Sequence, residues 1–227
     1  TADQELASRK VKFLLDTPQQ DGGQWDMVVA LFEKYGVVPK SVYSESISSS
    51  NSRELNQLLN KLLRQDAQIL RELALNGADE ASLQAKKEAL LQEIFNFLAM
   101  SLGLPPRKFD FAYRDKDGNY HREADLTPQA FYQKYVDLKL DDYVSIINAP
   151  TADKPYGKSY TVEMLGNVVG SKPVRYLNVE MKRLKELAIA QMQAGETVWF
   201  GSDVGQSSNR KAGIMEEGMQ FIDTQSG

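Results

Sequence analysis

The sequence contains very few residues of the types that carry out nucleophilic or metal chemistry. Cysteine is absent, and histidine occurs once, at position 121. Thiol nucleophiles, disulfides and thiolate metal sites are therefore excluded within these residues. Paired-histidine zinc sites and a serine–histidine–aspartate triad are nearly excluded as well. We expect His121 to be a surface or hydrogen-bonded residue beside a hairpin turn, and no self-contained active site in this chain.

Three short stretches resemble functional motifs, and each lacks a residue that its motif requires. The run Asp115–Asn119 begins like a calcium loop, but Tyr120 stands where the loop glycine belongs, so we expect a hairpin turn. Gly157–Ser159 ends like a phosphate-binding loop without the earlier glycine. Gly201–Gly205 has the glycine spacing of a hydrolase nucleophile elbow, with Asp203 in place of the serine.

A different feature is the glycine pair Gly22-Gly23, which directly precedes an amphipathic segment beginning at Trp25. Each glycine loses more conformational entropy on ordering than any other residue, so the pair calls for a physical reason. One reason is a turn before a helix. The other is that something approaches the main chain closely at this point. The residues alone leave both open.

The composition indicates a globular protein without a strong charge. A hydrophobic content of 42% is ample for a packed core, and a formal net charge of −4 makes nucleic acid an unlikely partner. No apolar run approaches the roughly 20 residues of a membrane-spanning helix, and the start has no hydrophobic signal core. We therefore expect a cytoplasmic protein that does not enter a membrane. The missing initial Met indicates a piece of something longer.

Helical periodicity dominates the first half of the chain. We expect a short helix over Leu6–Leu15 and a buried one over Trp25–Tyr35, with Gly36 as an αL cap. The serine-rich stretch 44–51 is the best candidate for a domain boundary. Two long amphipathic helices then follow, the first with a capping box begun by Asn51, and they form an antiparallel αα-hairpin broken at 76–77 and ended by Gly103.

The period changes after residue 108, where alternating aromatic residues predict a β-hairpin. Thr127 and Pro128 indicate the start of a helix. Further expected elements are a short strand at Val144–Asn148, a helix over Leu184–Met192 that Asn178 caps and Gly195 ends, and a strand over Thr197–Phe200. These elements together predict an α+β protein.

Several longer strings resemble one peptidase family. DGGQWDMVVALFEKYGVVPKSVYSES is similar to the segment of papain-like cysteine peptidases in which a glycine pair precedes a helix, with Ser44 where that family usually has proline. The strings AYRDKDGNYHREADLTPQAFYQKYV, KPYGKSYTVEMLGNVVG and AGETVWFGSDVGQ are similar to the aminopeptidase C and bleomycin hydrolase branch. The resemblance covers the chain up to about residue 212, and 213–227 match weakly.

This resemblance implies a cytoplasmic thiol aminopeptidase that removes N-terminal residues from peptides, needs no cofactor and assembles as a homo-oligomer, a hexamer in the intact family. It implies part of a papain-like fold with a large, mainly helical insertion. The expected division is a helical portion with a cleft edge at 1–47, the insertion at 48–173 and an incomplete β-portion at 174–227. The catalytic Cys and its Gln are expected before the segment matching residue 1, and the His and Asn after that matching residue 227.

The residues that the resemblance transfers are therefore substrate-binding ones, and no catalytic or metal-binding residue is assigned. Gly22 and Gly23 border the cleft, where an extended peptide can pair with the main chain. Trp25 lies near a side-chain pocket or, equally, packs in the core. Gly201 follows a strand that leads to the opposite wall, and Trp199 and Phe200 on that strand are expected mainly in the core.

Two functional hypotheses stay open at this point. The chain is a fragment of a thiol aminopeptidase, inactive by itself because it has no thiol. Alternatively, it behaves as an independent helical module for oligomerisation or interaction.

Overall fold

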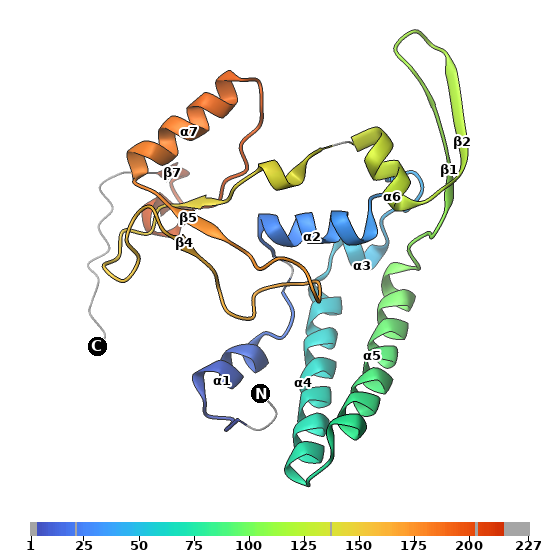
Figure 1. Cartoon of the computed structure of the whole chain (residues 1–227), viewed down its shortest axis with the longest axis vertical. Coiled ribbons are helices and arrows are strands. Elements are labelled where there is room, and N and C mark those ends of the chain that lie inside the picture. Colours follow the sequence, from blue (N-terminus) through green and yellow to red (C-terminus); the bar gives the residue numbers. More distant parts are fainter. Residues whose placement is uncertain (1–3, 21, 137, 203, 216–227) are drawn as a thin grey trace. The chain divides into compact units, whose positions relative to one another are not determined.

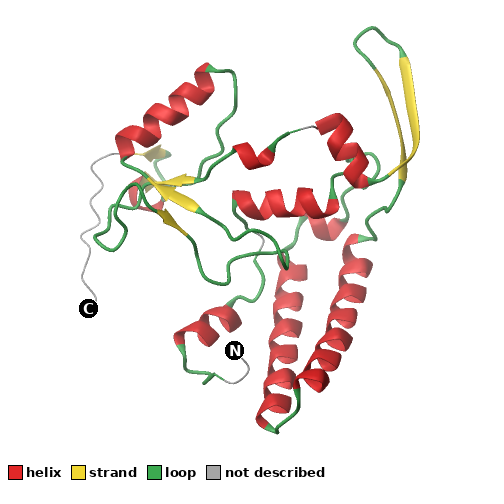
Figure 2. Cartoon of the chain, in the orientation of Figure 1, coloured by secondary structure: helices red, strands yellow, loops and turns green. Residues whose placement is uncertain are grey.

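The computed structural model describes residues 4–20, 22–136, 138–202 and 204–215, and Figure 1 labels most of its helices and strands. Helices and short strands both occur, which confirms a mixed α and β protein (Figure 2). The chain divides into two compact units, one of residues 1–145 with 159–176 and the other of residues 146–158 with 177–227. The division expected from the family, at 47/48 and 173/174, stays a prediction.

The first two helices confirm the periodicity of the N-terminal sequence. Helix α1 (Arg9–Asp16) begins at Ser8, whose side chain accepts a hydrogen bond from the main chain of Val11 at 3.3 Å. Helix α2 (Trp25–Tyr35) ends at Gly36. The predicted αL cap is wrong in detail, because Gly36 has φ 71° but an extended ψ of −160°. This conformation turns the chain toward the main chain of Pro128, which a side chain on Gly36 would overlap.

The predicted helical hairpin is present as α4 (Arg53–Leu75) and α5 (Glu80–Leu102). Apolar side chains are buried along it at Leu59, Leu90 and Ile94. The serine-rich stretch before it contains a short helix, α3 (Ile47–Ser50), with a capping box of its own. The capping role predicted for Asn51 is wrong, because Asn51 ends α3 and α4 begins after Ser52. Serine is frequent at helix starts, so a serine-rich stretch can contain a short helix as readily as a loop. The domain boundary expected here stays a prediction.

The predicted β-hairpin consists of β1 (Phe109–Arg114) and β2 (Tyr120–Leu126), paired antiparallel. Helix α6 (Pro128–Phe131) follows, and Thr127 caps it as predicted by accepting from Ala130 N–H at 3.1 Å. It continues into the π-helical turn η1 (Tyr132–Val136). Three buried side chains, Phe109, Leu126 and Phe131, form a core where the hairpin meets α6. The remaining elements of this unit are η2 (Leu140–Asp142) and β4 (Ser159–Tyr160).

The second unit is centred on β3 (Ile146–Ile147), which pairs in parallel with the end of β5 (Tyr176–Asn178). Helix α7 (Met181–Gln193) follows, and Gly195 turns the chain after it with φ 84°. Short elements then close the described chain, namely η3 (Gly205–Ser207), β6 (Ser208–Asn209) and β7 (Ile214–Met215).

The capping role predicted for Asn178 is wrong. Glu180 occupies the N-cap position of α7, and Asn178 is completely buried. Its Oδ1 accepts from the Ala149 N–H at 2.9 Å, and its Nδ2 donates to the carbonyls of Ala149 at 3.0 Å and Lys154 at 2.6 Å. Asparagine suits a helix cap and a buried loop anchor for the same reason, because its short amide bonds readily to main chain.

The strand predicted over Thr197–Phe200 is absent from the structure. Trp199 and Phe200 are 74% and 85% exposed, so the core positions expected for them are wrong in this chain. A segment with high strand propensity forms a strand only where a neighbouring strand supplies hydrogen bonds. Within the described residues, no strand pairs with 197–200. Among the helices described, none is long and apolar enough to cross a membrane.

Candidate functional site

The candidate site is the main chain just before α2, together with the first turn of that helix. Gly22 and Gly23 are exposed in an irregular segment. A Cβ atom on Gly22 would meet no atom within 4 Å apart from its chain neighbours, and one on Gly23 would meet only the Met27 sulfur, at 3.9 Å. Gly23 does not have a positive φ. No described residue therefore packs closely enough against this segment to require glycine.

Trp25 is the first residue of α2 and is half-buried. Its ring packs against that of Tyr143, with the centroids 5.4 Å apart and the planes inclined at 54°. This is a favourable geometry for an aromatic pair. Trp25 thus has a packing role in the unit while part of it stays accessible. Its place beside a substrate pocket stays a prediction.

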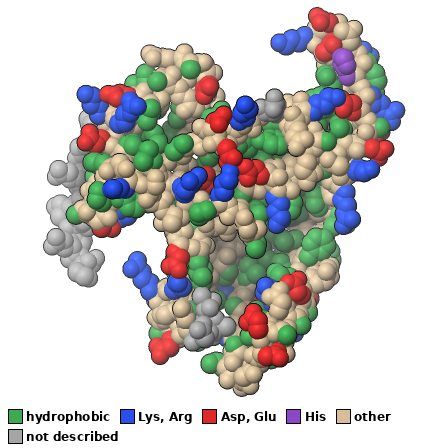
Figure 3. All heavy atoms as spheres, viewed as in Figure 1, with side chains coloured by type: hydrophobic (Ala, Val, Ile, Leu, Met, Phe, Trp, Pro, Cys, Tyr) green, Lys and Arg blue, Asp and Glu red, His purple; other side chains and the backbone are tan. Residues whose placement is uncertain are grey.

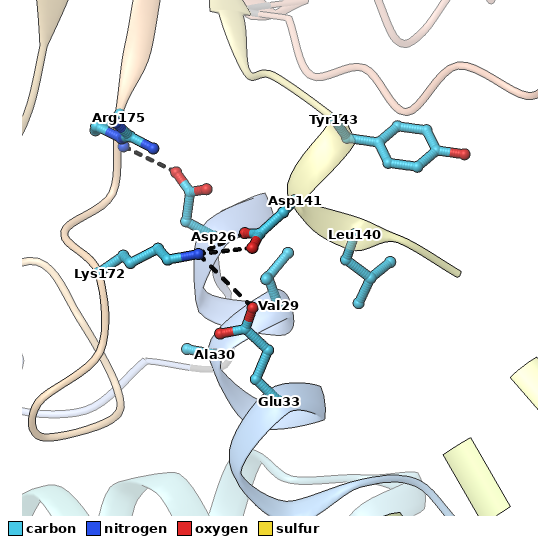
Figure 4. Close-up of a pocket in the computed structure, with 9 residues that line it drawn as sticks. All are labelled: Asp26, Val29, Ala30, Glu33, Leu140, Asp141, Tyr143, Lys172 and Arg175. Atoms are coloured by element: carbon cyan, nitrogen blue, oxygen red, sulfur yellow. Dashed lines mark hydrogen bonds and ion pairs between the residues drawn. The ribbon is translucent and has the colours of Figure 1, made fainter. Parts of the chain in front are cut away.

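A small hollow lies beside this helix, with room for about one water-sized molecule. Figure 4 shows the residues around it. Val29, Ala30 and Leu140 supply its apolar part. Its charged groups are Asp26, Glu33, Asp141, Lys172 and Arg175.

Lys172 is the cation that pairs with carboxylates of the hollow. Lys172 Nζ lies 2.7 Å from both carboxylate oxygens of Asp141 and 3.8 Å from Glu33. The hydrogen bond to Asp141 raises the pKa of Lys172, so this lysine stays a cation. Asp26, in the first turn of α2, accepts from the main-chain N–H of Arg175 at 2.8 Å. The bond from Arg175 to Asp26 holds the start of α2 in place, and Lys172, as a cation, has no free electron pair with which to act as a nucleophile.

Sequence reasoning missed this network and a second one on the other side of the segment. Asp26, Asp141 and Lys172 are far apart in the chain, and no spacing rule brings them together. Asn60, on α4, hydrogen-bonds to the main chain of Gln19, three residues before Gly22. Polar residues on a helix are usually solvated, so nothing in the local sequence distinguishes this one.

Gly201 lies in the other compact unit. It is exposed in the irregular segment after Phe200, and a Cβ atom there would meet nothing within 4 Å. Its grouping with Gly22, Gly23 and Trp25 stays a prediction. The neighbouring Asp203, in the elbow-like motif, lies outside the described residues.

The expectations for His121 and for residues 115–119 are confirmed. His121 is hydrogen-bonded, with Nε2 2.8 Å from the Asp115 carboxylate, and its ring stacks on Tyr113 at 4.9 Å. Residues 115–119 form the hairpin turn, where the Asp115 carboxylate accepts from the N–H groups of Asp117 and Asn119. Gly157 and Lys158 bond through their main chains to Asn178, which is a structural role.

Comparisons with known proteins identify relatives over nearly the whole chain. A family model described as the peptidase C1-like family matches residues 1–224. Aminopeptidase C of Streptococcus thermophilus is 79% identical over 215 residues, and that of Lactococcus lactis subsp. lactis (strain IL1403) is 67% identical over 213. These alignments cover 95% and 94% of this chain but 48% of each relative.

A solved structure gives the same result. The crystal structure of PepW from Lactobacillus rhamnosis HN001 is similar with a TM-score of 0.88 and 64% identity. The match covers 92% of this chain and 47% of that one. The chain therefore spans about half the length of the relatives it matches.

Proposed function

The chain belongs to the peptidase C1-like family, and on that premise we propose that it forms about half of a cysteine-type aminopeptidase. This enzyme would hydrolyse the first peptide bond of its substrates. The observation that carries the proposal is the 79% identity, over 95% of the chain, to a protein named aminopeptidase C. The 48% coverage of that relative leaves room for catalytic residues in the rest of the enzyme.

The thiolate of such an enzyme would come from residues outside these 227, which include no cysteine. The single histidine is bonded to Asp115 at the tip of the β-hairpin and stacked on Tyr113. Because that ring already has structural partners, we assign the catalytic histidine to the other half as well. The chain described here would then contribute substrate binding and scaffolding, and it would be inactive alone.

The glycine pair carries the substrate-binding part of the proposal. An extended peptide can bind by hydrogen-bonding to exposed main chain, as an added strand does. Gly22 and Gly23 are exposed; a side chain on Gly22 would project into open space, and one on Gly23 would meet only the Met27 sulfur. Glycine would then be needed at these positions because a larger side chain would occupy the space outside the chain where the peptide lies. Trp25 and Tyr143 would form an apolar wall beside it, and Gly201, in the other unit, is also proposed as a substrate-binding residue.

A kinetic experiment on the whole polypeptide that contains these residues tests this function. An aminoacyl-fluorogenic substrate with thiol reductant should be hydrolysed by the whole polypeptide and not by the 227-residue chain. Gly23→Val should raise KM more than it lowers the melting temperature, since the valine would occupy the space of the peptide. Turnover by the purified 227-residue chain would overturn the assignment of the nucleophile to the other half. An unchanged KM with a lowered melting temperature would show that the glycine pair serves only as a turn before the helix.

We also propose that the whole enzyme is cytoplasmic and assembles from several copies. Apolar side chains exposed on the hairpin α4–α5 support the assembly (Figure 3), and they are Leu58, Leu75, Leu91, Phe95 and Met100. Light scattering of the whole enzyme would decide the point. A strictly monomeric enzyme at high concentration would contradict it.

A further inference from the structure

One side chain of α4 holds the main chain that leads into the candidate edge. The Oδ1 atom of Asn60 accepts from the N–H of Gln19 at 2.8 Å, and its Nδ2 donates to the Gln19 carbonyl at 2.9 Å. Both bonds are partly buried. Two bonds to one residue reproduce what a neighbouring strand supplies to a main chain. Gln19 is thereby fixed three residues before Gly22.

Neighbouring residues of α4 support the same contact. Asn60, Arg64 and Arg71 follow one another at i, i+4 and i+11, which places them on one face of the helix. Arg64 donates to the carbonyls of Leu15, at 2.7 Å, and Asp16. Arg71 donates to that of Gln4. The arginine bonds lie at exposed positions, so the Asn60 pair is the one better protected from competing water.

The glycine pair consequently lies between two anchors. Upstream is Gln19, held by Asn60, and downstream is the start of α2, where Asp26 bonds to Arg175. Five residues, 20–24, connect Gln19 to Trp25. Glycine-rich main chain has the most conformational freedom to lose, so it stays ordered only where its ends are fixed.

We propose that Asn60 is a positioning residue for peptide binding, which holds the main chain of Gly22 and Gly23 in the conformation that an extended peptide pairs with. The proposal rests on the proposed function, since it assigns a purpose to the order of this segment. The side chain of Asn60 connects the helical hairpin to the segment before Gly22 through its two hydrogen bonds to the main chain of Gln19.

The expected kinetic effect follows from where the cost of ordering falls. If the loss of Asn60 leaves Gly22 and Gly23 without a fixed conformation in the free enzyme, every bound peptide must fix it, both in the substrate complex and in the transition state. Such a loss is shared by the bound substrate and the transition state, so it raises KM and leaves kcat nearly unchanged. Losing one or two partly buried hydrogen bonds corresponds to a change in KM of about tenfold.

The experiment compares Asn60→Ala with Gln65→Ala in the whole polypeptide. Gln65 is an exposed amide on the same helix, so its loss controls for the change in composition. We expect Asn60→Ala to raise KM for an aminoacyl-fluorogenic peptide about tenfold with kcat within about twofold. Hydrogen exchange of residues 19–24, followed by mass spectrometry, should be faster in this variant. Gln65→Ala should match the wild type in both measurements.

Other outcomes separate the possible failures. An unchanged KM in Asn60→Ala, whether or not the melting temperature falls, overturns the positioning role. If Asn60→Ala does not fold, Asn60→Asp keeps the acceptor for the Gln19 N–H and loses the donor. That variant should show a smaller rise in KM, and a wild-type KM there overturns the proposal. A wild-type polypeptide without aminopeptidase activity refutes the proposed function instead, and unchanged exchange of residues 19–24 in the Asn60 variant then refutes the inference independently.

Discussion

The main chain of Gly36 lies directly against that of Pro128, so that a Cβ atom on Gly36 would overlap the Pro128 carbonyl and the nitrogen of Gln129. Val37 N–H donates to the Pro128 carbonyl at 3.1 Å in the same crossing. This contact joins the end of α2, whose first turn forms the candidate site, to the start of α6. Gly36 is thus a glycine that a close approach of two main chains requires, whereas the approach of a peptide to Gly22 and Gly23 stays a prediction.

Replacing Gly36 should therefore destabilise the whole polypeptide strongly. We expect Gly36→Ala to lower the free energy of unfolding by about 3 kcal/mol or more, because it adds a clash to a backbone conformation almost restricted to glycine. Gly118→Ala is the matched control, since Gly118 has φ 83° with no atom within 4 Å of a Cβ position. It should cost about 1–2 kcal/mol. Equal losses in urea unfolding would show that the clash is relieved by a small shift of the chain.

Asn178 should be equally sensitive because it is buried with three main-chain partners. Asn178→Ala leaves one N–H and two carbonyls without these bonds, and we expect a loss of about 3 kcal/mol or more in the free energy of unfolding. The exposed Asn96 is the comparison, and Asn96→Ala should change it by less than about 0.5 kcal/mol. A loss at Asn178 as small as that would mean that water replaces the amide.

The stability of the turn at Asp115 should depend on pH in the acid range. Hydrogen bonds to the His121 ring first, and then to Asn119, lower the pKa of Asp115 from 3.8 to about 2. A carboxylate whose pKa is lower in the folded than in the unfolded state stabilises the folded turn at pH values above its unfolded pKa. This contribution is lost as the pH falls from about 4 through 2. The Asn119 amide shift in NMR should follow that titration. Asp115→Asn should abolish it, whereas Asp117→Asn should leave it in place.

Trp199 should matter far more in the whole enzyme than its exposure in this chain indicates. At 74% exposure, truncation would change stability by no more than about 0.5 kcal/mol. If the other half of the enzyme covers the segment 197–200, Trp199→Ala should cost about 3–5 kcal/mol. Urea unfolding of the whole polypeptide distinguishes these values. A change near zero would show that the segment stays exposed in the assembled enzyme.

Local patterns were sufficient for several elements whose structure is itself local. The helices of the hairpin and the cap at Thr127 follow from spacing within a few residues, and the structure confirms them. The same rules failed at Asn178 and at 197–200. The short amide side chain of asparagine can bond to main chain at a helix cap or in a buried loop equally well. A segment with high strand propensity forms a strand only when a partner strand is available for pairing.

The candidate site could be anticipated only in part. The open glycine pair at 22–23 and the neighbouring Trp25 were identified from the family resemblance, and their substrate-binding role stays a prediction. The residues that hold this segment, Asn60 and Arg175, were not. They are separated from it by tens of residues in the chain, and each is an ordinary polar residue in its own local sequence.

The sequence by itself determined which chemistry the chain lacks, which segments are helical and which family it belongs to. Those conclusions depend on residue type and short-range spacing, which do not change with folding. The tertiary structure alone decided that Gly36 is the sterically required glycine and that Asn60 binds the main chain of Gln19. Contacts of this kind join segments that the fold brings together, and hydrogen bonds and steric overlap are settled by distances of a few tenths of an ångström.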